Sequence, residues 1–106
     1  MENKAIYHKD IATLLSQIPE DSVLSRSVHK DEKTDITLFS FAKGQELTEH
    51  TSSHAAIIQV LSGQAAINLG GEKVEGLSGS WIYMPPGLPH SLKAVTNFTM
   101  LLTLIK

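Results

Sequence analysis

The most constraining feature of this chain is a segment in which glycine and proline restrict the backbone just before a histidine. The segment reads Gly79-Ser80-Trp81-Ile82-Tyr83-Met84-Pro85-Pro86-Gly87-Leu88-Pro89-His90. Glycine adopts the positive φ values that tight turns need, and proline holds φ in one narrow region. The segment therefore predicts a strand, a stiff turn and an imidazole that loses little freedom when it is held in one place.

A second segment, residues 44–63, begins and ends with glycine and contains His50 and His54. If the chain there is one extended strand, residues 50, 52 and 54 point to the same side, so the two imidazoles can act together. Gln59 is the only polar side chain in the run 55–61, and an amide in an apolar strand needs a polar partner. Alternation places Gln59 on the opposite side, so its participation requires a bulge or a turn.

Apolar and β-branched residues recur in short runs that Gly and Pro turns separate. These runs are 35–42, 55–61, 65–69, 80–84 and 98–105. Short strands at close spacing predict an all-β barrel or sandwich. Residues 9–18 have apolar side chains at helical spacing before Pro19, and this pattern predicts one short amphipathic helix.

Several of the predicted strands are apolar on both faces, most clearly the run 98–105. One face of a strand in a small barrel belongs to the core, and the other normally contacts water. A second apolar face indicates that something covers it. We therefore expect a homodimer that packs sheet against sheet.

Composition sets the size and excludes some partners. The 106 residues suit a single domain, 1–106, with a helix and lead-in strand in 1–34 and the barrel in 35–106. Nine Lys and Arg against eleven Asp and Glu, without charge runs, argue against nucleic-acid or anionic-membrane partners. No secretory signal or membrane-spanning run is visible, which predicts a cytoplasmic protein with small-molecule partners. Without cysteine, any metal must use nitrogen and oxygen ligands.

Both segments resemble the sequence motifs of the cupins. In the second motif, G-x5-P-x-G-x2-H-x3-N, the matching residues are Gly79, Pro85, Gly87 and His90, and Ala94 stands at the final Asn position. In the first motif, G-x5-H-x-H-x3,4-E-x6-G, the matching residues are Gly44, His50 and Gly63, and Ser52 and Ala56 stand at the second His and the Glu positions. The resemblance implies a small single-domain cupin of the RmlC-like, cupin 2 type, with an all-β double-stranded β-helix (jelly-roll) barrel.

The resemblance also implies a metal site, because metal-binding cupins use the histidines of both motifs and the Glu of the first. Transferred strictly, only His50 and His90 remain as ligands. We expect His54 to replace the missing imidazole. We expect Gln59 to be a further ligand, because the segment from Gln59 to Gly63 resembles that of small cupins with Gln at this position. Glu49 is a weaker alternative because a neighbour of His50 on a strand points away. A helical H-x3-H zinc site is disfavoured because Thr-Ser-Ser is poor helix material.

Three imidazoles and an amide would leave a divalent ion its full charge and favour an anionic oxygen ligand. The expected ion is Fe, Ni, Mn, Zn or Cu. One hypothesis is a metal-dependent enzyme acting on a small oxygen-bearing substrate, by oxygenase, decarboxylase or isomerase chemistry. A second is a non-catalytic ligand-binding or sensing module, and a third is a structural dimer with incidental histidines. No catalytic residue can be named from the sequence.

Overall fold

The computed structural model describes residues 3–106, and these form two antiparallel sheets. The larger sheet has the strand order β1-β2-β9-β4-β7, and the smaller one has the order β3-β8-β5-β6. The strands are β1 (Val23–Lys30), β2 (Thr34–Phe41), β3 (Glu46–His50), β4 (Ala55–Ser62), β5 (Gln64–Leu69), β6 (Glu72–Leu77), β7 (Trp81–Met84), β8 (His90–Ala94) and β9 (Phe98–Ile105). The expected all-β jelly-roll architecture is confirmed.

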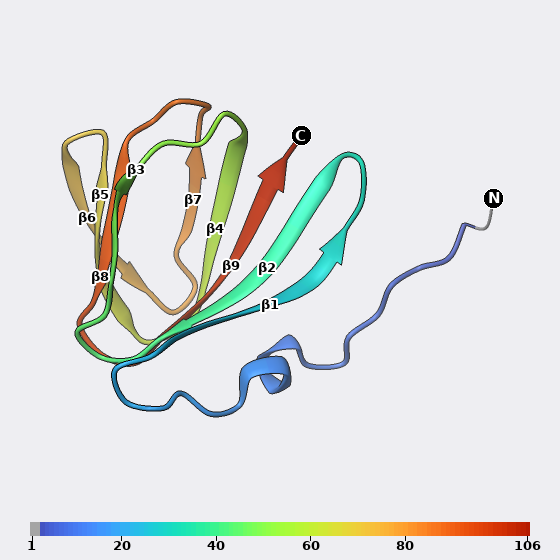
Figure 1. The fold of residues 1–106 in the computed structure, drawn as a ribbon, viewed down its shortest axis with the longest axis horizontal. Coiled ribbons are helices and arrows are strands. Elements are labelled where there is room, and N and C mark those ends of the chain that lie inside the picture. Colours follow the sequence, from blue (N-terminus) through green and yellow to red (C-terminus); the bar gives the residue numbers. More distant parts are fainter. Residues whose placement is uncertain (1–2) are drawn as a thin grey trace.

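The two sheets lie close together at one end and spread apart at the other. Figure 1 shows the open end at the top of the view, where the loops β3–β4 and β7–β8 lie. The predicted glycine-rich and proline-rich turn of residues 85–89 is the second of these loops. The sequence motifs therefore meet at the mouth of the barrel.

Alternation along β9 follows the sequence prediction. Phe98 and Met100 are buried between the sheets, and the register pairs Met100 with Val60 of β4 and with Phe39 of β2. Phe98 packs on Phe41 with ring centroids 6.1 Å apart. Burying side chains of this size stabilises a fold by roughly 1.5–3 kcal/mol each. The closed end of the barrel thus holds the apolar core and supports the open end.

The short helix predicted over residues 9–18 is present, but it is a 3-10 helix and it is shorter than predicted. Residues 3–106 contain one 3-10 helix, η1 (Ile11–Leu15), and Asp10 caps it by accepting a hydrogen bond from the N–H of Ala12 at 3.1 Å. Isolated helices shorter than about 12–15 residues are marginal, so packing decides their form. Here η1 lies against β1 and β2. No helix within residues 3–106 is long and apolar enough to cross a membrane.

Candidate functional site

The structure brings His50 and His90 together at the open end. The two residues face each other across the antiparallel pair β3 and β8. Their ring centroids are 4.1 Å apart, and the ring planes are inclined by 60°. His90 is only 9% exposed, whereas His50 lies at the surface. The pair is therefore open to solvent on one side only.

A bulge in β3 determines which side chain faces His90. Leu47 pairs with Leu92, and the next pair is His50 with His90, so β3 uses one residue more than β8 over this stretch. With regular pairing, Glu49 would stand opposite His90. Because an extra residue re-aims the side chains beyond it, the bulge puts His50 there instead.

Each imidazole is fixed by a backbone carbonyl two residues earlier. His50 Nδ1 donates to the carbonyl of Thr48 at 3.0 Å, and His90 Nδ1 donates to the carbonyl of Leu88 at 2.9 Å. A carbonyl oxygen only accepts, so Nδ1 carries the proton and Nε2 of the neutral ring keeps its lone pair. Metal-ligating histidines usually show this arrangement.

The pair lines a cavity of about 420 Å³ between the spread sheets. Its lining residues are His50, Thr51, Ser52, Ser53, Ala56, His90, Leu102 and Leu104. Apart from the imidazoles, this set combines hydroxyl groups on one loop with apolar side chains from β4 and β9. None of these described lining residues is an Asp, Glu, Lys or Arg, so the wall is without formal charge when the histidines are neutral.

The loop after β3 does not continue as an extended strand. The N–H of His54 donates to Ser52 Oγ at 3.1 Å, and the N–H of Gly87 donates to the carbonyl of Ser52 at 2.8 Å. The first bond bends residues 52–54, and the second ties the two mouth loops together. Because β3 ends at His50, the expected alternation over residues 50–54 is wrong, and His54 is not among the residues that line the cavity.

Gln59 lies on the outer face of β4, away from the cavity. The register of β4 with β7 and β9 is regular from Ala56 to Gln59, so no bulge intervenes. Ala56 and Ile58 face inward and are buried, and Gln59 is exposed beside Trp81. The structure therefore does not bring Gln59 to His50 and His90, because plain alternation sends it to the other side.

The two imidazoles offer an ion two protein ligands, which is fewer than the three of a typical open site and the four of a closed one. Within residues 3–106 there is no group of three or more His, Cys, Asp and Glu side chains placed to hold an ion. Two imidazoles in the correct tautomer can provide two ligands, which leaves the remaining positions to a bound molecule or water. A closed structural site with four protein ligands is not built here.

Sequence reasoning singled out His50, Ser52, Ala56 and His90 as motif positions but did not assign the other residues of the cavity wall. Leu102 and Leu104 line it because they continue the buried face of β9, and the alternation of residues 98–105 could have identified them. Thr51 and Ser53 carried no signal, since their placement depends on the turn that follows β3.

Comparison with known proteins agrees with this architecture. Residues 37–106 match the family model described as Cupin domain. An uncharacterized protein of Aquifex aeolicus (strain VF5) is 31% identical over 98 residues, which cover 91% of this chain and 80% of that protein. The crystal structure of a conserved protein of unknown function from Streptococcus pyogenes is 39% identical, with a TM-score of 0.83 and coverage of 95% of this chain and 90% of that one.

A cupin superfamily protein from Desulfitobacterium hafniense DCB-2 shares the fold at lower identity. It is 23% identical, with a TM-score of 0.86 and coverage of 99% of this chain and 98% of that chain. At this identity the likeness concerns the fold alone, so the chemistry of the site must be argued from its own residues.

Proposed function

This chain belongs to the cupin domain family, and we propose that its His50–His90 pair holds a divalent transition metal ion at the mouth of the barrel. The observation that carries the proposal is the pair of hydrogen bonds from Nδ1 to the carbonyls of Thr48 and Leu88. These bonds orient both rings and leave both Nε2 atoms as lone-pair donors. Imidazole ligands suit Fe, Ni, Cu or Zn, with Mn also accepted.

The cavity beside the proposed ion would accept a small oxygen-bearing molecule. A volume of about 420 Å³ falls within the roughly 300–1,000 Å³ that ligand pockets typically have. Apolar contacts from Leu102 and Leu104 would hold the carbon skeleton, and hydroxyl groups of residues 51–53 would face its polar atoms. When bound, the ion supplies Lewis-acid or redox chemistry to that molecule.

Two activities are compatible with such a site. The first is a metal-dependent enzyme, in which the open coordination positions accept the substrate. The second is a non-catalytic binding or sensing module. This alternative is favoured by the cavity lining, because with both histidines holding the ion its other described residues include no carboxylate, amine or phenol that could move a proton.

Metal binding tests the proposal. Untagged wild-type protein should bind an equimolar amount of Zn²⁺, Ni²⁺ or Co²⁺ by elemental analysis and isothermal titration calorimetry. His50→Ala and His90→Ala should each weaken binding at least about tenfold, because each removes one of two protein ligands. His54→Ala, the matched control outside the cavity, should stay within about twofold of wild type. Equal binding by wild type and His90→Ala contradicts the proposal.

Turnover separates the two activities. Metal-loaded protein is incubated with small oxo acids, β-diketones and sugars, and the mixtures are followed by NMR. An enzyme consumes its ligand in an amount far above the protein concentration, and His90→Ala abolishes that consumption. A binding module shifts ligand resonances in the metal-loaded state without consuming the ligand. Consumption that persists in His90→Ala excludes the proposed site as the catalyst.

A further inference from the structure

Ala56 lies in the wall of the cavity that the two histidines line. It is 2% exposed, it faces inward from β4, and it lines the same cavity as His50 and His90. It is also the residue at the Glu position of the first motif. A methyl group there leaves room that a longer acidic side chain would fill.

The walls around Ala56 offer no replacement for that carboxylate. Its cross-strand neighbours are Met84 on β7 and Leu104 on β9, and both are apolar. Ser52, which stands at the second His position, already accepts a hydrogen bond from the N–H of His54 through its hydroxyl oxygen. Glu49 is exposed on the bulge and does not line the cavity. None of the described residues that line the cavity therefore carries a carboxylate that would offset the two positive charges of an ion held by the two histidines.

We infer that the ligand of this protein is a small carboxylate with a neighbouring oxygen atom, and that its carboxylate binds in the space beside Ala56 and completes the metal site. The inference rests on the proposed metal binding by His50 and His90. The ligand supplies the negative charge and the oxygen donors that the chain lacks, and a 2-oxo or 2-hydroxy acid can occupy two open positions. Thr51 and Ser53 add hydroxyl groups to the same cavity wall.

Because the histidines and the small carboxylate would both coordinate the ion, binding of the ion and binding of the carboxylate should be cooperative. The carboxylate has no charged partner in the metal-free cavity, so it binds strongly only after the ion. By reciprocity, the carboxylate must also tighten binding of the ion by the same factor, and couplings of about 5–150-fold are typical. An ordinary closed metal site shows no such dependence on the ligand.

The test uses pyruvate and its uncharged analogue methyl pyruvate as matched probes. Each is titrated by calorimetry into wild-type protein with and without Ni²⁺, with a correction for Ni²⁺ binding by the probe in solution. Pyruvate should bind the Ni²⁺-loaded protein at least about tenfold more tightly than methyl pyruvate and at least about tenfold more tightly than it binds the metal-free protein. Equal affinities of the two probes for the Ni²⁺-loaded protein overturn the inference.

Ala56→Glu places a carboxylate on the chain itself and so tests the position. This variant should bind Ni²⁺ at least about tenfold more tightly than wild type and pyruvate at least about tenfold more weakly. Ala56→Gln has the same length without the charge, so it should weaken pyruvate binding while tightening Ni²⁺ less than Ala56→Glu does. Unchanged pyruvate binding by a folded Ala56→Glu variant contradicts the assigned position.

The outcomes also distinguish this inference from the metal proposal. Wild-type protein that binds Ni²⁺ but does not discriminate between pyruvate and methyl pyruvate keeps the metal site and loses the carboxylate ligand. Wild-type protein that binds no Ni²⁺ in the absence or presence of pyruvate overturns both. Since the two probes are compared on the wild type, the result does not depend on whether the Ala56 variants fold.

Discussion

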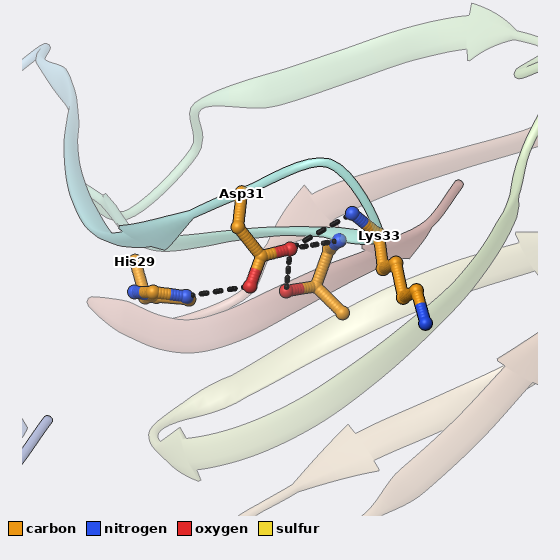
Figure 2. Close-up of polar contacts among 4 residues, drawn as sticks. His29, Asp31 and Lys33 are labelled. Atoms are coloured by element: carbon orange, nitrogen blue, oxygen red, sulfur yellow. Dashed lines mark hydrogen bonds and ion pairs between the residues drawn. The ribbon is translucent and has the colours of Figure 1, made fainter. Parts of the chain in front are cut away.

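Asp31 shows how one side chain fixes the turn between β1 and β2. Figure 2 shows its carboxylate contacting His29 and the residues that follow it in the turn. His29 Nε2 lies 2.9 Å from one oxygen, and the N–H groups of Lys33 and Thr34 each donate to the other oxygen at 2.8 Å. The hydrogen bond from His29, followed by the two backbone N–H bonds, lowers the pKa of Asp31 well below its ordinary value of 3.8.

This lowered pKa predicts a pH-dependent contribution to stability. A carboxylate whose folded-state pKa is lowered stabilises the fold above its unfolded pKa, and this stabilisation is lost as the pH falls below about 3.8 toward the folded value. Asp31→Asn should therefore lower the melting temperature at pH 7, and the gap to wild type should narrow as the pH falls below about 3.8. Thermal unfolding followed by circular dichroism between pH 7 and pH 2 measures this gap.

A matched control is Glu32→Gln, which removes a neighbouring carboxylate from the same turn. It should show a smaller gap at pH 7, since no hydrogen bond is given to Glu32 by His29 or by the turn N–H groups. A gap for Asp31→Asn that stays constant down to pH 2 would refute the electrostatic explanation.

At the level of strands and turns, the sharpest constraint lies where Gly63 joins β4 to β5. Its φ is +85°, and a Cβ added there would lie 2.0 Å from the carbonyl oxygen of Asn97. Gly44 has nearly the same φ, +86°, but an added Cβ would have no atom within 4 Å. The two glycines thus separate the cost of backbone conformation from the cost of a steric clash.

Alanine substitution at both positions should show this difference. Gly44→Ala should lower the free energy of unfolding by roughly 1–2 kcal/mol, the cost of a left-handed conformation for a residue with Cβ. Gly63→Ala should lower it by at least about 2 kcal/mol more, because the backbone of residues 97 and 98 must also move. Urea unfolding with linear extrapolation measures both values. Equal losses for the two variants would show that the close approach to Asn97 is relieved without cost.

At the scale of the whole molecule, large apolar or aromatic side chains are exposed on the larger sheet. Trp81 is 59% exposed and Tyr83 50% exposed on β7, which is the edge strand, and Ile105 on β9 is 42% exposed. Elsewhere on this sheet, residues of η1 line a cavity together with Leu61 and Thr99. Monomeric proteins rarely expose extended apolar surface, so we propose that the expected homodimer forms through the uncovered part of this sheet.

Substitution of Trp81 tests the dimer. Trp81→Glu should raise the dimer dissociation constant at least about tenfold, because it places a charge in an apolar contact surface. Size-exclusion chromatography with light scattering, over a range of protein concentrations, measures the change. Leu77→Glu is the control, since Leu77 is 46% exposed on β6 of the other sheet. A wild-type protein that is monomeric at all concentrations, or dissociation by both variants alike, contradicts the assignment of this face.

The sequence by itself determined the architecture and the end of the barrel that carries the site. Turn chemistry and alternation are local, so Gly79 to His90 could specify a strand, a stiff turn and a fixed imidazole, and residues 98–105 could specify one buried face. His50 and His90 were identified from their match to the two cupin motifs, and the structure does bring them together.

Only the tertiary structure decided which other side chains share that cavity. The bulge in β3 places His50 rather than Glu49 opposite His90. The hydrogen bond from the His54 N–H to Ser52 Oγ ends the strand-like alternation after His50. The regular register of β4 keeps Gln59 on the outer face of the sheet. Each of these depends on pairing between strands that are distant in the sequence or on where a strand stops. A shift of one residue sends a side chain to the opposite face, and no local pattern records that shift.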